Sequence, residues 1–274
     1  MICPVTVLRL EQMTATESFE ERVKKAAKWI HDAEKVVVFT GAGISTESGL
    51  PDYRGPDGVW TRRDKGLPPR PLEKAWHEFE PNRGHLAVVE LQKMGKLDLL
   101  ISQNVDNLHL KSGIEPDRIV ELHGNGFLLY CLRCGKKIQK EEAGWDDARH
   151  GHGYRTEKES PGRPRCSCGG KLMSTVVNFG DPMPANEMET AHRHSGVCDV
   201  FMVVGSSLVV HPAAEMPGVA LDAGAKLILI NQGETPYDRL AHIIFRESAG
   251  EVLEAILAEL RRLEGPESSR RDKG

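Results

Sequence analysis

Four short runs of mainly apolar residues, each ending in or followed directly by small or polar residues, limit the fold of this chain more than any other feature. Runs that are apolar throughout are typical of parallel strands buried on both faces. Helix-like stretches lie before, between and after them, and such alternation favours an open α/β sheet. The runs are VVVF (36–39), LDLLIS (97–102), DVFMVVG (199–205) and KLILIN (226–231).

Three stretches have the spacing of amphipathic helices. Ser18 and Glu21 form an S-x-x-E capping box, and apolar residues follow it at helical intervals. The stretch 85–95 ends in a glycine, as helices often do, and 249–263 reads as a final amphipathic helix. We expect the charged residues 263–274 to form a tail without fixed structure.

One region, residues 127–174, lacks sustained periodicity and contains two cysteine pairs. We interpret it as a small module inserted into the α/β domain. The expected division is an N-terminal extension (1–17), a discontinuous α/β domain (18–126 and 175–262), the inserted module (127–174) and the tail (263–274).

The composition favours a soluble globular protein, because 39% of the 274 residues are hydrophobic and 28% are charged. A net charge of −4 gives no indication of nucleic-acid binding, and no apolar run approaches the length of a membrane span. Residues 1–13 lack the features of a signal peptide. We therefore expect a cytoplasmic protein, or a nuclear one in a eukaryotic cell, whose thiols stay reduced.

A segment rich in glycine and small polar residues, FTGAGISTESGLPDYRG (39–55), follows the first apolar run. Gly41 and Gly43 would let the backbone turn and approach a ligand, and free N–H groups with a following helix N-terminus would attract phosphate. A ligand-free turn is the alternative, because Thr46 stands where a full G-x-G-x-x-G pattern has its third glycine. A structural turn, however, has no need of the Asp52, Tyr53 and Arg54 that follow.

Polar residues also follow the other three apolar runs. Gln103, Asn104 and Asp106 come after the second run, GSS (205–207) after the third, and NQ (231–232) at the end of the fourth. Each could be ordinary turn chemistry. Because ligands bind beyond the carboxyl ends of parallel strands, four such clusters together indicate a dinucleotide-binding crevice.

His123 lies in the short motif ELHGN. It is one of eleven histidines, and a single histidine is more often structural than catalytic. Its functional interpretation is a general base, because imidazole titrates near neutral pH and can take a proton from a hydroxyl.

The paired cysteines predict a structural zinc site, because four thiolates complete the coordination of Zn²⁺. Redox thiols or a disulfide are the alternatives, and the C-x-C spacing of the second pair is shorter than a usual C-x-x-C. His150 and His152 lie between the pairs as substitute ligands, whereas Cys3 and Cys198 are interpreted as ordinary thiols. The predicted ligands are Cys131, Cys134, Cys166 and Cys168.

Several motifs in one order make the chain resemble the sirtuins over residues 18–262. The first of them most resembles the sirtuin branch that includes nuclear chromatin deacylases. The motifs are GAGISTESGLPDYRGPDGVW, QNVDNLH, ELHGN, the paired cysteines, NFGDPMP, GSSLVVHPA and LILIN.

The resemblance implies a Rossmann-like open parallel sheet with a small inserted zinc-binding module. It also implies an NAD-dependent protein-lysine deacylase that consumes NAD⁺, releases nicotinamide and O-acyl-ADP-ribose, and holds one structural Zn²⁺. The substrates would be acylated lysine side chains of proteins. The acyl oxygen would attack the ribose as nicotinamide leaves, and His123 would activate a ribose hydroxyl; Asn104 is the second catalytic residue implied.

The resemblance also assigns binding roles, residue by residue. The pyrophosphate and ribose would lie against Gly41, Ala42, Gly43 and Ser45. The nicotinamide half would contact Asp52, Tyr53, Arg54, Gln103, Asn104 and, through its carboxamide, Asp106. The adenosine half would contact Gly205, Ser206, Ser207, Asn231 and Gln232. The substrate peptide would pair as an added strand with Phe179, Gly180 and Val209.

Two departures from the family pattern leave this chemistry in place: Asp181 replaces the usual glutamate, and the second cysteine pair is C-x-C. The Tyr and Arg pair of desuccinylating sirtuins is absent between Trp60 and His85. We therefore expect neutral acyl groups, acetyl or longer. Alternative functions are protein mono-ADP-ribosylation, a non-catalytic NAD-sensing zinc module and, more remotely, hydride transfer.

Overall fold

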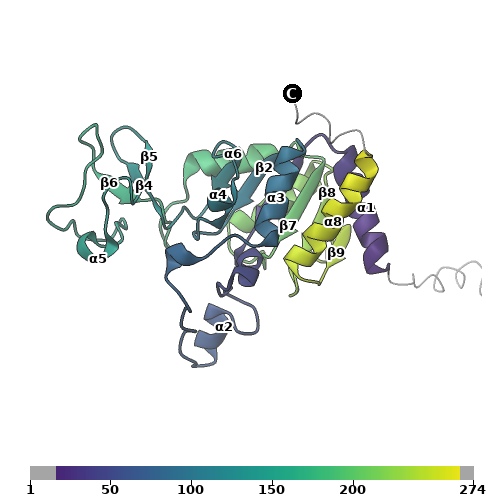
Figure 1. Ribbon diagram of the computed structural model, residues 1–274, viewed down its shortest axis with the longest axis horizontal. Helices are drawn as coiled ribbons and strands as arrows, with labels where there is room; N and C mark the ends of the chain where they lie inside the picture. Colours follow the sequence, from purple (N-terminus) through teal and green to yellow (C-terminus); the bar gives the residue numbers. More distant parts are fainter. Residues whose placement is uncertain (1–16, 266–274) are drawn as a thin grey trace, which may run out of the picture.

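The computed structural model describes residues 17–265 and contains a six-stranded parallel sheet in the order β3-β2-β1-β7-β8-β9 (Figure 1). This confirms the predicted Rossmann-like sheet, including all four apolar runs. The chain builds outward from β1 to β3 and then crosses to β7, so the strand order reverses between β1 and β7. The strands are β1 Val36–Thr40, β2 Leu97–Ser102, β3 Ile119–Glu121, β7 Val200–Val204, β8 Lys226–Ile230 and β9 Ile243–Phe245.

Helices cover both faces of the sheet, which explains why the strands are apolar throughout. In β1, Val36 and Val38 pack into one core, whereas Val37 and Phe39 pack into the other. The first face is covered by α1 Phe19–Asp32, α3 Arg83–Lys93 and α8 Ala249–Glu264. The second is covered by α6 Ala185–Ser195 and α7 Met216–Asp222.

The helix boundaries follow local capping chemistry. The predicted capping box is present at the start of α1, where the Glu21 N–H donates to Ser18 Oγ over 3.2 Å and the Ser18 N–H donates to Glu21 Oε2 over 2.8 Å. Helix α3 starts two residues before the predicted position, because the Asn82 side chain accepts from the Gly84 N–H over 2.8 Å and caps it.

The inserted segment forms a separate small antiparallel sheet, β5-β4-β6, drawn at the left of Figure 1. Leu129, Trp145 and Leu172 pack with two of the paired cysteines in its own small core. This zinc-binding module (residues 127–174) contains β4 Leu128–Cys131, β5 Lys137–Gln139, α5 Asp147–His150 and β6 Leu172–Ser174.

Short helical turns complete the fold, and α2 projects below the sheet in Figure 1. They are η1 Ala42–Ser48, α2 Val59–Asp64, η2 Trp76–Glu78, α4 Leu108–Ser112 and η3 Ala213–Glu215. Within residues 17–265 no helix combines the length and apolarity needed to cross a membrane. Helix α8 runs to Glu264, so the first two residues of the predicted tail (263–274) are helical and the predicted boundary is wrong by two residues. Cys3, residues 1–16 of the N-terminal extension and residues 266–274 of the tail lie outside the described residues.

Candidate active site

Two glycine turns meet where the strand order reverses, one after β1 and one after β7. The Gly41 N–H donates to the Val204 carbonyl over 3.1 Å, and the Gly43 N–H donates to the Gly205 carbonyl over 2.9 Å. A Cβ on Gly43 would lie 2.7 Å from the Gly205 Cα, and one on Gly41 would lie 2.8 Å from the Gly205 oxygen. Only glycine allows the two turns to approach so closely.

This arrangement limits which N–H groups of the Gly-rich segment could contact a phosphate, and the phosphate interpretation itself stays a prediction. The N–H groups of Gly41 and Gly43 are already bonded to the β7 turn, so they are not free donors for an anion. The helix that follows is the 3₁₀ helix η1, which begins at once with Ala42. The glycines therefore join the first strand to the middle of the sheet, and the crevice lies over this junction.

A buried polar network lies beneath the junction. The Ser45 hydroxyl donates to Asp106 Oδ2 over 2.6 Å, and Asn104 Nδ2 donates to Ser45 Oγ and to the Gly41 carbonyl, each over 3.2 Å. Burial raises the pKa of Asp106, while the hydrogen bonds from Ser45 and the Leu108 N–H oppose that rise. The network holds Asn104 in place at the floor of the crevice.

A pair of histidines extends this buried region, although no pattern in the sequence indicates it. His109 Nε2 lies 2.9 Å from Thr40 Oγ1, and its ring centre is 4.9 Å from that of His85. Burial lowers the pKa of His85 to about 4 and that of His109 well below its ordinary range. Both rings are therefore neutral at physiological pH and add no positive charge to the crevice.

The loop after β8 is held by one arginine, for which the sequence offers no signal. Arg246 Nη1 donates to the carbonyls of Asn231 and Gly233 over 2.9 and 2.5 Å, and Nη2 pairs with Asp238. These contacts fix the loop after β8 that carries Asn231 and Gln232. Arg246 stands in no polar cluster at a strand end, so its role becomes visible only in the folded chain.

His123 has the geometry of a general base. Its Nδ1 lies 3.0 Å from the Gln103 carbonyl oxygen, which can only accept a hydrogen bond, so the proton of the neutral ring sits on Nδ1. Burial lowers the pKa of His123, and the bond to Gln103 partly opposes this. The ring is thus neutral near pH 7, with an unprotonated Nε2 available to accept a proton.

A single cavity of about 1160 Å³ runs from the glycine junction past His123 to the surface. Most of the predicted site residues line it, whereas Ser45 and Asp106 lie behind its wall in the buried network. The predicted residues along its wall are Gly41, Ala42, Gly43, Asp52, Tyr53, Arg54, Gln103, Asn104, His123, Phe179, Gly180, Gly205, Ser206, Ser207, Val209, Asn231 and Gln232.

Aromatic side chains that are half-buried or exposed line the outer part of this cavity. The Trp60 ring centre is 5.1 Å from that of Tyr53 and 5.7 Å from that of Phe179, and the Arg54 guanidinium lies 4.7 Å from the Trp60 ring centre. Phe179 is 82% exposed. Trp60 stands within the motif that carried the resemblance and could have been chosen from it.

The four predicted zinc ligands converge in the inserted module. Their sulfur atoms lie within 4.8 Å of one another, with Cys131 and Cys168 3.5 Å apart and Cys134 and Cys166 3.7 Å apart. Tetrahedral Zn²⁺ with Zn–S bonds of about 2.3 Å separates its sulfurs by about 3.8 Å, so the set fits the ion. Neither His150 nor His152 belongs to this cluster, so the alternative ligands are wrong.

Comparison with known proteins places the chain in a family. A family model described as the Sir2 family matches residues 70–212, and the chain belongs to this family. It is 38% identical to "NAD-dependent protein deacetylase 1" of Bradyrhizobium diazoefficiens over 248 residues, which cover 84% of this chain and 93% of that protein.

Two solved structures extend the likeness to the fold. One, described as "Structural Basis for the Mechanism and Regulation of Sir2 Enzymes", is 38% identical, has a TM-score of 0.69 and covers 89% of this chain and 99% of that chain. The other, "Sir2-p53 peptide-NAD+", is 30% identical, has a TM-score of 0.66 and covers 86% of this chain and 98% of that chain.

Proposed function

We propose that this protein is an NAD-dependent protein-lysine deacylase that releases nicotinamide and O-acyl-ADP-ribose. The observation that carries the proposal is the neutral His123, whose Nδ1–H donates to the Gln103 carbonyl while the ring lines the crevice. NAD⁺ supplies the ribose that accepts the acyl group, and acylated lysine side chains of proteins are its partners in the reaction.

The residues of this chain divide the work along the cavity. Asn104, fixed by Ser45 and the Gly41 carbonyl, would orient the nicotinamide ribose, and Nε2 of His123 would take a proton from a ribose hydroxyl. Asp106 would act on the nicotinamide carboxamide through this same network, because it lies behind the wall. The Gly205 turn and the loop after β8 would hold the adenosine half.

The zinc ion has a structural role, because four thiolates leave no open coordination position. The module would therefore form one folded wall of the substrate cleft, separate from the discontinuous domain of residues 18–126 and 175–262. Limited proteolysis between residues 126 and 175, with mass analysis of the fragments, tests this division.

Incubation with NAD⁺ and an acetyl-lysine peptide tests the function directly. Mass spectrometry should find deacetylated peptide, nicotinamide and O-acetyl-ADP-ribose in equal amounts. ADP-ribose on protein without peptide deacylation would favour mono-ADP-ribosylation instead, and binding of NAD⁺ without nicotinamide release would favour an NAD sensor. Absorbance of NADH would indicate hydride transfer.

The preferred acyl group and the cellular location complete the proposal. Neutral acyl groups fit a chain without the Tyr and Arg pair of desuccinylating sirtuins, and a panel of acetyl, longer and succinyl peptides tests this. We also propose a cytoplasmic location, or a nuclear one in a eukaryotic cell, and fractionation of the native host cells with an antibody against the protein tests this.

A further inference from the structure

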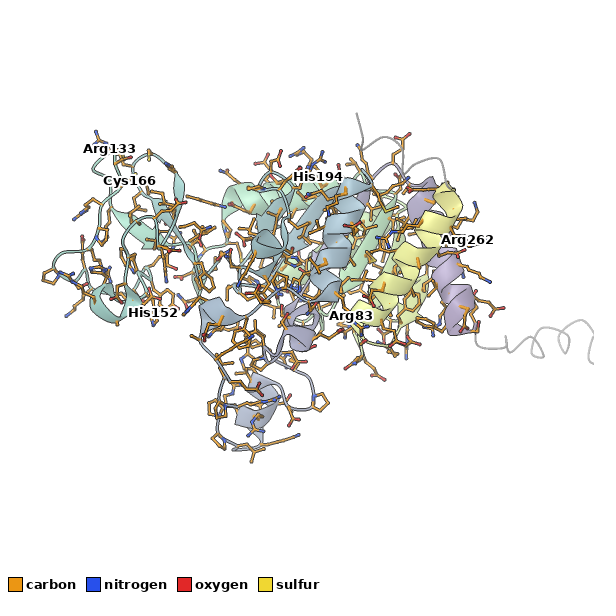
Figure 2. The ribbon with its side chains drawn as sticks, in the orientation of Figure 1. Arg83, Arg133, His152, Cys166, His194 and Arg262 are labelled. Atoms are coloured by element: carbon orange, nitrogen blue, oxygen red, sulfur yellow. The ribbon has the colours of Figure 1, made fainter. Side chains whose placement is uncertain are left out.

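One residue of the zinc-binding module, Tyr154, reaches the active-site cavity. Among the described residues of the 127–174 module, it alone lines that cavity. Its ring stacks on His152, with ring centres 5.2 Å apart and planes 26° apart. Figure 2 shows His152 at the lower end of the module, away from Cys166 and on the side toward which α2 projects.

The loop that carries Tyr154 is held by an ion pair that is largely buried. Arg163, 5% exposed, donates to Glu157 over 3.0 Å, and its guanidinium lies 5.2 Å from the Trp145 ring centre. Glu157 in turn accepts from the backbone N–H groups of His152 and Gly153 over 3.2 and 2.7 Å. Removing the Glu157 carboxylate would leave the charge of the buried Arg163 without its partner, so this ion pair helps to hold the loop in place.

Tyr154 completes an aromatic rim around the outer cavity. Two of the four tryptophans and two of the four tyrosines of the chain line this cavity, together with Phe179. Tyr53 and Trp76 are each 45% exposed, and Phe179 is 82% exposed. So much exposed aromatic surface at one opening is typical of a binding site, because covering it with an apolar group is favourable.

We propose that Tyr154 is a specificity-determining residue through which the zinc-binding module contacts the substrate, favouring peptides with a large apolar or aromatic side chain within two positions of the acylated lysine. The inference rests on the proposed deacylase function. The rim is continuous with the cavity that holds His123, and it is contributed from both sides by the module and by the segment around α2. A peptide bound along Phe179 and Val209 would bring its neighbouring side chains to this rim.

The acyl chain on the lysine is the other apolar group that could reach the rim. The experiment therefore varies the side chains that flank the lysine and the acyl chain separately. Peptides with Phe, Leu, Gly or Asp at each position from −2 to +2 carry one acetyl-lysine, and a second series keeps glycine flanks and lengthens the acyl chain. Fluorescence anisotropy measures binding of each peptide, and kcat and KM are measured with NAD⁺ saturating.

The variants are Tyr154→Ala, Tyr154→Phe and the control Leu132→Ala, which removes an exposed apolar residue of the same module outside the cavity. We expect the wild type to bind Phe- and Leu-flanked peptides about threefold to tenfold more tightly than Gly-flanked ones, as an aromatic contact implies. Tyr154→Ala should lose this preference through KM, while Tyr154→Phe and Leu132→Ala keep it. Zinc content and the KM for NAD⁺ should be unchanged in all three.

Three results would overturn the inference. One is an unchanged preference in Tyr154→Ala. Another is an equal loss for all peptides together with zinc loss, which would mean that the residue is only structural. The third is a loss confined to the series with longer acyl chains, which would assign the rim to the acyl group. Because anisotropy needs no turnover, a wild type without deacylation would refute the proposed function and still leave the peptide preference measurable.

Discussion

The two ends of the active-site cavity are built in opposite ways. At the crevice end, the turns after β1 and β7 are joined by backbone hydrogen bonds, and Ser45 and Asn104 are buried beneath them. At the rim, the exposed side chains of Trp76 and Phe179 lie on the short helix η2 and on a turn. The crevice is thus fixed by the chain's own hydrogen bonds, whereas the rim leaves aromatic surface open to contact with a bound peptide.

This difference teaches where each kind of selectivity resides. A preformed crevice suits a ligand of constant structure such as NAD⁺, because a fixed backbone holds it at little entropic cost. An aromatic rim suits peptides of varied sequence, because aromatic surface accepts many apolar groups. Mutations in the crevice should therefore change catalysis or NAD⁺ affinity, and mutations around the rim or module should change peptide selectivity.

The largest effect is expected from His123→Ala. Deacylation should fall by roughly 10²- to 10⁴-fold, because the general base is lost, while NAD⁺ and peptide binding persist. Mass spectrometry measures turnover and calorimetry measures binding, with His123→Tyr as a second variant and His192→Ala on the exposed part of α6 as the control.

Because burial lowers the pKa of His123 below 6.5, the ascending limb of the wild-type pH profile should lie below that value. Full activity in both His123 variants would contradict the role of the base.

Loss of the zinc ion should affect peptide turnover at the rim much more than NAD⁺ binding in the crevice. Cys134→Ser should release zinc and unfold the module, since structural zinc contributes on the order of 10 kcal/mol in small zinc peptides. Metal analysis and thermal denaturation measure this, with Cys198→Ala as the control. Peptide turnover should be lost while NAD⁺ binding largely remains. Equal loss of NAD⁺ binding would show that the crevice depends on the module and would break the comparison.

A side chain added at Gly205, in the glycine junction, should cause a steric clash that affects the crevice and not the rim. In Gly205→Ala the new Cβ would lie 2.3 Å from the Ile44 nitrogen, so backbone must move, and we expect a loss of about 2–4 kcal/mol in unfolding free energy with weaker NAD⁺ binding. Gly66→Ala is the matched control, because its φ of +67° resembles the +63° of Gly205 but its Cβ meets nothing within 4 Å. Chemical denaturation of both variants gives the comparison, and equal losses would mean that backbone strain alone is responsible.

Arg246→Met should raise the KM for NAD⁺ by about tenfold while kcat and the peptide KM stay the same. The variant removes two hydrogen bonds to the loop after β8 and the pair with Asp238, and each bond to a charged group is worth roughly 1–3 kcal/mol. Steady-state kinetics measure the split, and Arg261→Met on α8 is the control. A fall in kcat with an unchanged KM for NAD⁺ would show that Arg246 does not act by positioning the loop after β8 for NAD⁺.

The same contrast explains how much could be predicted from the sequence. The four apolar runs, the capping box at Ser18 and the cysteine set are local patterns with direct physical causes, and the structure confirms them. The backbone pairing of Gly41 and Gly43 with the turn after β7 could not be predicted, because Gly205 lies more than 160 residues away in the chain. Arg246 and Tyr154 had no local signal, because only the folded chain brings them to the cavity.

The smallest expected effect comes from Glu121, which lies between the two ends. Its carboxylate accepts from Asn125 Nδ2 over 2.7 Å; Asn125 also donates to Asn107 beside the crevice and, through its N–H, to Thr175 at the exit of the module. Burial raises the pKa of Glu121 to about 7; the hydrogen bond from Asn125 and the charge of Lys137 oppose this, while Asp106 and Glu187 add to it.

A raised pKa in the folded state means that Glu121 favours folding fully below pH 4.5, its ordinary pKa, and loses this contribution as the pH rises to about 7. Glu121→Gln keeps an acceptor for Asn125 but carries no charge at any pH. The variant should therefore become more stable than the wild type by about 1–2 kcal/mol at pH 8, with little difference near pH 4.5, as measured by urea denaturation at both values. If the difference in unfolding free energy between the variant and the wild type were the same at both pH values, the Glu121 carboxylate would be exposed to solvent and its pKa would not be raised. The hydrogen bonds from Asn125 to Asn107 and Thr175 remain in this variant. We therefore expect its KM values for NAD⁺ and peptide to equal those of the wild type.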